Sequence, residues 1–349
     1  MDFENHTYRA EIEKELHAFL PGKLTSEWSE KAVGKARWKQ DESALTKAIS
    51  EPVWDFLERG GKRWRPILMM ACCGAVGGNP KVALPFTIIP ELIHNGTLII
   101  DDIEDNSDMR RGKPVLHKLF GLDIAVNAGN AIYLLPYTAI RDSKLTAEAK
   151  SEAYGIISTQ LLKCHLGQAI DIYWHSGKSE KIPTEEEYLQ MCSNKSGSLA
   201  CMAAKLGAQI GGGSESQIEA LGNFGETVGV VFQVQDDILN ISENQKLGKE
   251  LGDDLSEGKM TLLVIHTLNV APGSDKARLL EILGMHTKDE KLLTEAIEII
   301  KKHNSIEYAK KTASKLVEEA WKKIDEAFPP SNAKKELRAL AELVLHKVV

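Results

Sequence analysis

Apolar residues recur along most of this chain at the three- and four-residue spacing of amphipathic helices. Ile12 and Leu16 near the N-terminus show it, and so do Leu293, Ile297 and Ile300. Sustained alternation of apolar and polar residues, which a half-buried strand would require, is hard to find. The breaks between segments are short and rich in Pro or Gly, and none resembles an interdomain linker. They lie at residues 21–22, 77–80, 177–183, 211–214, 272–274 and 329–330.

The pattern predicts an all-α protein. We expect a single domain over residues 1–349, with a helical N-terminal extension (1–50), a central part that carries the motifs (51–270) and C-terminal helices (271–349).

One predicted helix ends in carboxylates. Residues 84–100 are apolar almost throughout and run directly into Asp101, Asp102, Glu104 and Asp105. At 100° per residue Asp101 and Asp105 lie one above the other, with Asp108 a turn further on, and like charges at this spacing repel. Mg²⁺ is a natural counter-ion, because it takes carboxylate oxygens and keeps waters that phosphates can replace. For an isolated acidic run, a solvated helix face is the favoured explanation.

A second apolar helix ends in the same way. Residues 230–235 are followed by Asp236 and Asp237, and Gly225 and Gly229 fall on the face of Asp236. Because glycines leave room beside a helix, we expect the two acidic helices to face each other across a cavity with an acidic mouth and an apolar interior.

Composition narrows the class of protein. The 349 residues include 43 basic and 50 acidic side chains, a net charge of −7, which argues against generic nucleic-acid binding. Five cysteines fit neither a zinc pattern nor a disulfide framework. The N-terminus lacks the features of a signal peptide, and no continuous apolar run reaches the 18 residues of a membrane span. We therefore expect a soluble, cytoplasmic protein without a membrane span.

Basic residues stand where an anionic ligand would need them. Three cations lie in the glycine-opened stretch 60–66, and Arg110 and Arg111 follow the first acidic cluster. Lys195, Lys249 and Lys259 are further candidates. Arg and Lys both suit phosphate groups, so we expect one diphosphate bridged by Mg²⁺ and a second held by cations.

The order of these blocks over residues 55–270 resembles the trans-isoprenyl diphosphate synthases, and within them most of all the eukaryotic-type geranylgeranyl diphosphate synthases. The blocks are Gly61-Lys62…Arg65, His94…Asp101-Asp102-x-x-Asp105…Arg110-Arg111, Lys195-Ser196, Phe232-Gln233-x-x-Asp236-Asp237 and Gly252…Asp254…Lys259. The resemblance implies a bundle of long antiparallel helices around a deep central cavity, usually in a homodimer. It implies Mg²⁺-dependent condensation of isopentenyl diphosphate with an allylic diphosphate (dimethylallyl, geranyl or farnesyl).

The same resemblance implies a role for each matched residue. Three Mg²⁺ ions with the bound diphosphate would be held by the two acidic clusters, Asp101, Asp102, Asp105, Asp236 and Asp237. The allylic diphosphate would be gripped by Arg110, Lys195 and Lys259, with help from Lys249. Isopentenyl diphosphate would be held by Lys62, Arg65, His94 and Arg111. The catalytic set would be Asp101, Asp105, Asp236, Lys195, Ser196 and Gln233, the last two with oriented dipoles that stabilise a carbocation.

Departures from the family pattern bear on product length. Asn240 replaces a third Asp of the second cluster, and Ser196 stands where many members have Thr. Short-chain members carry aromatic floors at the sites of Gly96 and Thr97, so the product should exceed fifteen carbons. Tyr133 and His165 are the candidate floors deeper in the cavity, although taken by itself each is better explained by packing, His165 as a hydrogen-bonded histidine and Tyr133 as a core residue. Geranylgeranyl diphosphate is the expected product, and a longer polyprenyl diphosphate is the alternative.

Two rival functions stay open. A class I terpene cyclase would ionise the same diphosphate but would not need Lys62, Arg65 and Arg111. A non-catalytic partner subunit of a heteromeric synthase could have lost its carboxylates, whereas this chain keeps nearly all of them.

Overall fold

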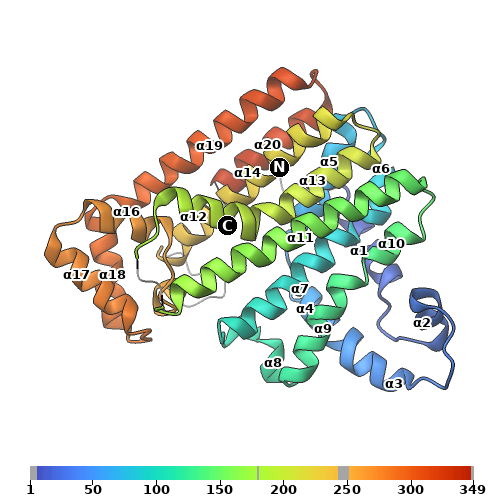
Figure 1. The fold of residues 1–349 in the computed structure, drawn as a ribbon, viewed down its shortest axis with the longest axis horizontal. Coiled ribbons are helices and arrows are strands. Elements are labelled where there is room, and N and C mark those ends of the chain that lie inside the picture. The colour runs from blue at the N-terminus through green and yellow to red at the C-terminus, as the bar shows by residue number, and fades with distance from the viewer. Residues whose placement is uncertain (1–5, 179–180, 243–250, 347–349) are drawn as a thin grey trace. The chain divides into compact units, whose positions relative to one another are not determined.

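Helices account for nearly all regular structure in the computed structural model, which describes residues 6–178, 181–242 and 251–346. Within these ranges the strands are two short ones, β1 (Met109–Arg110) and β2 (Lys113–Pro114), which pair antiparallel. The all-α prediction is confirmed. Figure 1 follows the helices along the chain.

Contacts divide the chain into two compact units. The first unit comprises residues 1–157 and 203–218, and the second comprises residues 158–202 and 219–349. The boundaries fall inside three helices rather than in linkers: α11 (Ala147–His175), α13 (Ser198–Ile210) and α14 (Glu215–Asn240). The single domain expected from the sequence stays a prediction.

The first unit contains the N-terminal helices. They are α1 (Arg9–Phe19), α2 (Ser26–Val33), α3 (Glu42–Leu45), α4 (Glu51–Glu58), α5 (Trp64–Ala75), α6 (Pro80–Ala83), α7 (Ile88–Glu104), α8 (Leu116–Leu119), α9 (Leu122–Leu134) and α10 (Tyr137–Arg141). A π-helical turn (Thr46–Ser50) precedes α4, and a 3-10 turn (Leu84–Phe86) precedes α7.

Close helix packing builds the core of this unit. An added Cβ at Gly207 of α13 would lie 2.0 Å from the Met69 carbonyl oxygen of α5, so only glycine lets these backbones meet. Helices α7 and α9 also lie against each other, with Gly129 of α9 beside Ile99 and Ile100. This packing buries the apolar length of α7 and leaves its acidic end to form a site.

The stretch Pro80–Glu104 contains α7 and is, among the described residues, the one helical stretch long and apolar enough to be a candidate membrane span. Counting consecutive apolar residues missed it, because polar residues interrupt the run. Of its apolar window, 67% is buried inside the protein, as in the core helix of a folded domain.

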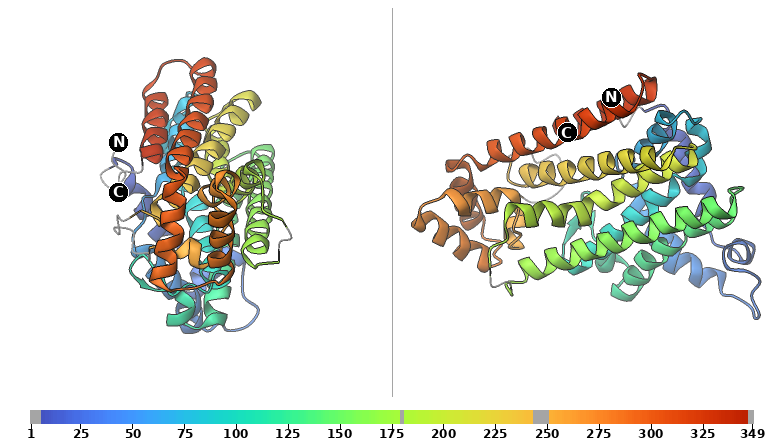
Figure 2. Two further views of the ribbon diagram at one scale, coloured as in Figure 1. Left: turned by 90° about the vertical axis from the view of Figure 1, so that its left-hand side faces the viewer. Right: turned by 45° about the horizontal axis from the view of Figure 1, so that its top comes forward.

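The second unit contains the C-terminal helices. They are α12 (Glu185–Cys192), α15 (Asp253–Ser256), α16 (Leu262–Val270), α17 (Gly273–Gly284), α18 (Glu290–Lys302), α19 (Ser305–Ala327) and α20 (Asn332–His346). Thr184 and Glu187 form a complete capping box at the start of α12. Helix α19 packs against α16, α18 and α20, and Figure 2 shows it as one long orange-red helix.

Candidate functional site

The first acidic cluster lies at the C-terminal end of α7. Asp101 and Asp102 are in its last turn, and Asp105 is the capping residue, whose N–H donates to the Asp101 carbonyl at 2.8 Å. Asn106 then takes a left-handed conformation (φ 49°) and the helix stops. The expected position of Asp108 one turn further along the helix is therefore wrong: Asp108 is exposed and pairs with Lys118 of α8.

Asp101 and Asp102 point to different surroundings, as adjacent helical residues must. Asp101 is partly exposed, whereas Asp102 is 1% exposed. Arg110 of β1 donates from Nε to Asp102 at 2.7 Å, and its second nitrogen lies 2.5 Å from Asp102 and 3.4 Å from Asp101. Asp102 thus holds Arg110 beside the partly exposed Asp101.

The second acidic cluster repeats this division on α14. Asp236 is partly exposed, and Asp237 is 3% exposed. The Tyr188 hydroxyl donates to Asp237 at 2.5 Å, and Gln233 Nε2 donates at 2.9 Å. Burial, followed by the nearby charge of Asp254, raises the pKa of Asp237 to about 7 in spite of these donors. The negative charges of Asp237 and Asp254 therefore repel each other, and a cation bound nearby would be favoured.

Asn240 has a structural role in this unit. Its side-chain oxygen accepts from the Asp254 backbone N–H at 3.2 Å, and its carbonyl accepts from the Gly252 N–H at 2.9 Å. It therefore ties α14 to α15. A carboxylate here would add a further negative charge beside Asp237 and Asp254, so asparagine limits the repulsion.

Lys195 and Ser196 lie in a π-helical turn, Ser193–Gly197, between α12 and α13. Two glycines hold this turn. A Cβ added at Gly167 of α11 would lie 2.3 Å from the Lys195 backbone nitrogen, and one at Gly229 of α14 would lie 2.7 Å from Gly197 Cα. The prediction of open space beside α14 at Gly229 is therefore wrong, because the backbone of the turn occupies that space.

Side-chain hydrogen bonds connect the turn to the second acidic cluster. The Ser196 hydroxyl donates to Gln233 Oε1 at 2.8 Å, and Gln233 in turn donates to Asp237. The structure thus brings Ser196 and Gln233 together, as their assignment to one function requires. Tyr188 completes this network; the sequence gives no signal for it, since 49 residues separate it from Asp237.

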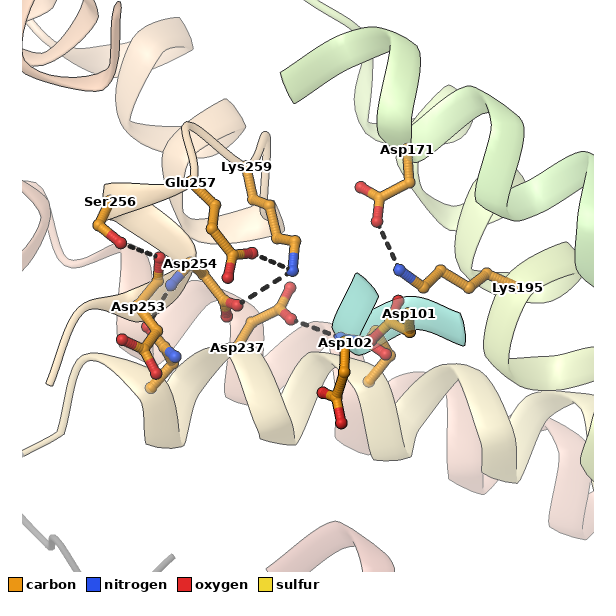
Figure 3. A network of polar contacts seen from close by, with 12 residues as sticks. Asp101, Asp102, Asp171, Lys195, Asp237, Asp253, Asp254, Ser256, Glu257 and Lys259 are labelled. Carbon is orange, nitrogen blue, oxygen red and sulfur yellow. Dashed lines mark hydrogen bonds and ion pairs between the residues drawn. The ribbon is translucent and has the colours of Figure 1, made fainter. Parts of the chain in front are cut away.

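Each described lysine that is predicted to bind the allylic diphosphate has acidic partners (Figure 3). Lys195 Nζ lies 2.6 Å from Asp171 of α11, and Lys259 pairs with Glu257 and lies 3.7 Å from Asp254. Burial would raise the pKa of Asp171, but the charges of Lys195 and Lys259 outweigh it and lower the pKa. Asp171 and Glu257 were not among the predicted site residues. Lys249 lies outside the described residues.

The predicted isopentenyl diphosphate residues lie in the first unit. Lys62 is partly exposed, and Arg65 is 5% exposed with its guanidinium carbon 4.4 Å from the Trp64 ring centroid. Burial and then the charges of Arg65 and Arg111, followed by those of two further arginines, hold the pKa of His94 well below its ordinary value. Burial lowers the pKa of Arg111 to about 10. Neutral His94 thus adds a hydrogen-bonding group, and no charge, to a cationic cluster.

The predicted chain-length residues have different surroundings. A Cβ added at Gly96 would lie 3.1 Å from the ring of Tyr133, so these two residues are in contact, and Tyr133 is 8% exposed. Thr97 is partly exposed and donates its hydroxyl to the His94 carbonyl at 2.7 Å. His165 is exposed on α11 and is not a buried packing residue.

The donor chemistry fits Mg²⁺. Asp101, Asp105 and Asp236 are partly exposed carboxylates, and the pKa of Asp237 is raised by burial and then by the negative charge of Asp254, which a cation would offset. Among the described residues no three His, Cys, Asp or Glu side chains converge into a ready-made ligand set. Mg²⁺ tolerates this, because it is usually bound by one or two carboxylates together with waters and substrate phosphates.

Comparisons with known proteins agree with this chemistry. The family model described as Polyprenyl synthetase matches residues 46–300. The short chain isoprenyl diphosphate synthase of Methanothermobacter thermautotrophicus is 39% identical over 82% of this chain and 87% of its own. The geranylgeranyl pyrophosphate synthase atmG of Aspergillus flavus is 36% identical over 78% of this chain and 77% of its own. The crystal structure of geranylgeranyl pyrophosphate synthetase from Pyrococcus horikoshii superimposes with a TM-score of 0.84 at 32% identity, covering 98% and 97% of the two chains.

Proposed function

Because this chain belongs to the polyprenyl synthetase family, we propose that it condenses isopentenyl diphosphate with an allylic diphosphate to give a trans-polyprenyl diphosphate, geranylgeranyl diphosphate. The observation that carries the proposal is that the two aspartate pairs, Asp101–Asp102 and Asp236–Asp237, are arranged in the same way. In each pair one carboxylate is buried against protein donors and the other is partly exposed, and in the first pair Arg110 also lies 3.4 Å from the partly exposed Asp101.

Asp101, Asp105 and Asp236 would hold Mg²⁺, as three ions together with the diphosphate. When bound, Mg²⁺ supplies Lewis-acid stabilisation of the charge on the leaving diphosphate. Asp102 and Asp237, which the family pattern also places among the ligands, keep Arg110 and Gln233 in position in this chain.

The chain's cations and dipoles serve the remaining steps. Arg110, Lys195 and Lys259 grip the allylic diphosphate while its C–O bond breaks, and Lys62, Arg65, His94 and Arg111 hold isopentenyl diphosphate. Ser196 and Gln233 direct their dipoles at the allylic cation. The double bond of isopentenyl diphosphate then forms the new C–C bond, and the released proton passes to the departing diphosphate, so the protein supplies no base.

Tyr133 sets the product length in this proposal. Gly96 offers no side chain to stop the growing prenyl chain, and the Tyr133 ring packed against it provides the floor. Each residue of a helix adds about 1.5 Å, so a floor one or two turns deeper would lengthen the product by about one isoprene unit.

A homodimer is the proposed assembly, and a cytoplasmic location stays a prediction. Leu162, Leu166 and Tyr173 of α11 are 52–61% exposed, and helical geometry places them within about 40° of one another. Such an apolar stripe suits an interface between two copies. Light scattering of the purified chain should give twice the 38.5 kDa mass.

The test is product formation by the purified chain alone. It should require Mg²⁺, isopentenyl diphosphate and an allylic primer, and mass spectrometry should identify a twenty-carbon diphosphate. Cyclised hydrocarbon made from the allylic substrate alone would point to a terpene cyclase. Product that appears only after a second subunit is added would point to a partner subunit.

A further inference from the structure

Arg63 lies between two predicted substrate cations, Lys62 and Arg65, and is not itself one of the predicted site residues. It is 4% exposed and adopts a left-handed backbone conformation (φ 50°) at the residue that precedes α5. A non-glycine residue keeps such a conformation only where surrounding contacts hold it. The contacts of Arg63 therefore decide the path of the stretch that carries Lys62 and Arg65.

Each of the three guanidinium nitrogens of Arg63 donates to a protein acceptor. Nε donates to Glu13 of α1 at 2.8 Å, and a terminal nitrogen donates to Glu91 of α7 at 2.7 Å. The other terminal nitrogen donates to the Leu57 carbonyl at 3.0 Å. The guanidinium is thus directed at the protein, which identifies Arg63 as a support of the stretch and not as a phosphate ligand.

The same network extends to a third substrate cation, Arg111. Glu91 also accepts from Asn95 Nδ2 at 2.8 Å, and Asn95 Oδ1 accepts from Arg111 at 3.5 Å. Arg111 is itself left-handed (φ 53°) and donates to the Gly60 carbonyl at 2.5 Å. Glu91 thus connects two segments at the 60–66 stretch, because it accepts from Arg63 directly and is linked to Arg111 through Asn95.

Gly61 is the point where the two arginines approach the turn. A Cβ added there would lie 3.1 Å from a terminal nitrogen of Arg63 and 3.5 Å from one of Arg111. The glycine at this position therefore leaves room for the Arg63 guanidinium beside the turn that presents Lys62, whereas Arg111 would stay at an ordinary contact distance.

We propose that Glu13 and Glu91 are positioning residues for isopentenyl diphosphate binding. Through Arg63 they hold the 60–66 stretch, and through Asn95 Glu91 also orients Arg111, before the substrate arrives. Preorganised cations lose less freedom on binding and so bind more tightly. The inference rests on the proposed function and gives the N-terminal helix α1 a part in the site.

Glu13 offers the sharper test, because its side chain is 30% exposed and its loss leaves Arg63 paired with Glu91. Glu11 is the matched control: it lies on the same helix, and its carboxylate pairs with the surface residue Lys81. We would measure kcat and both KM values for the full-length wild type, Glu13→Gln, Glu13→Asp and Glu11→Gln with Mg²⁺ and the preferred allylic primer. Thermal unfolding of each variant would be recorded in parallel.

Glu13→Gln should raise the KM for isopentenyl diphosphate about fivefold, the equivalent of one weakened charge-assisted contact, with kcat and the KM for the primer unchanged. Glu13→Asp should recover part of the loss, and Glu11→Gln should match the wild type. Equal KM values for Glu13→Gln and Glu11→Gln would overturn the inference, and so would a uniform loss that follows melting temperature. A wild type that makes no product would instead refute the proposed function.

Discussion

Gly167→Ala tests how the Lys195–Ser196 turn is held. Alanine in the interior of α11 gains about 1 kcal/mol of helix propensity over glycine. Against this, the new Cβ would meet backbone atoms of the turn, the nearest at 2.3 Å, where side-chain rotation cannot relieve the overlap. Overpacking of this kind costs about 3 kcal/mol, the upper end of its usual range. The net effect is a destabilisation of roughly 2 kcal/mol.

Gly155→Ala is the matched control, because Gly155 lies on the same helix and nothing would come within 4 Å of its added Cβ. It should stabilise the protein by about 1 kcal/mol. The two variants should therefore differ by roughly 3 kcal/mol in the free energy of unfolding measured with urea.

Activity gives a second measurement of the same perturbation. Displacing Lys195 and Ser196 by about 1 Å should lower kcat about 100-fold in Gly167→Ala, and Gly155→Ala should match the wild type. If both variants were stabilised by similar amounts and stayed fully active, the turn would not rest on Gly167, and the reasoning about how α11 positions it would be wrong.

Three further predictions follow from individual side chains. Tyr133→Ala should shift the products toward longer chains on thin-layer chromatography; an unchanged distribution would remove Tyr133 as the floor. Asp101→Asn should lower turnover about 100-fold with little loss of stability. Asp102→Asn should lower the free energy of unfolding by about 2 to 3 kcal/mol, because it weakens the main partner of Arg110. Equal stability losses for the two variants in urea titrations would contradict the different roles of Asp101 and Asp102. Burial raises the pKa of Cys73 to about 11, so its thiolate is disfavoured in the folded protein. The free energy of unfolding should therefore fall as pH rises from about 9 toward 11. Iodoacetamide at pH 8 should spare Cys73 in the folded protein and label it in urea, and rapid labelling of the folded protein would refute its burial.

The sequence predicted well those features that depend on local periodicity. The helices that end at the two aspartate clusters were predicted, because their apolar lengths and acidic ends are continuous in the chain. The end of α7 was missed by one turn, and Asp108 was misplaced with it. Asn106, which tolerates the left-handed conformation, was an available signal. So were the carboxylates themselves, which are unfavourable at the negative end of a helix dipole.

Contacts between distant segments could not be predicted. The absence of a side chain at Gly229 was visible in the sequence, but what would occupy the space was not, and a backbone turn took the place of the expected opening. The pairs Asp171–Lys195 and Tyr188–Asp237 join residues 24 and 49 positions apart. No periodic pattern within either segment indicates such pairing.

Helix geometry explains why each aspartate pair has one buried and one partly exposed carboxylate. Adjacent residues on an α-helix point about 100° apart, so two neighbouring carboxylates cannot both face the substrate when one side of the helix is buried. The buried one must then find donors, because an unpaired buried charge is strongly destabilising. Asp102 finds Arg110, and Asp237 finds Tyr188 and Gln233. The Asp102 pairing places Arg110 3.4 Å from the partly exposed Asp101. The Asp237 pairing holds Gln233, so in our proposal the second carboxylate of each pair positions a group that acts together with the first.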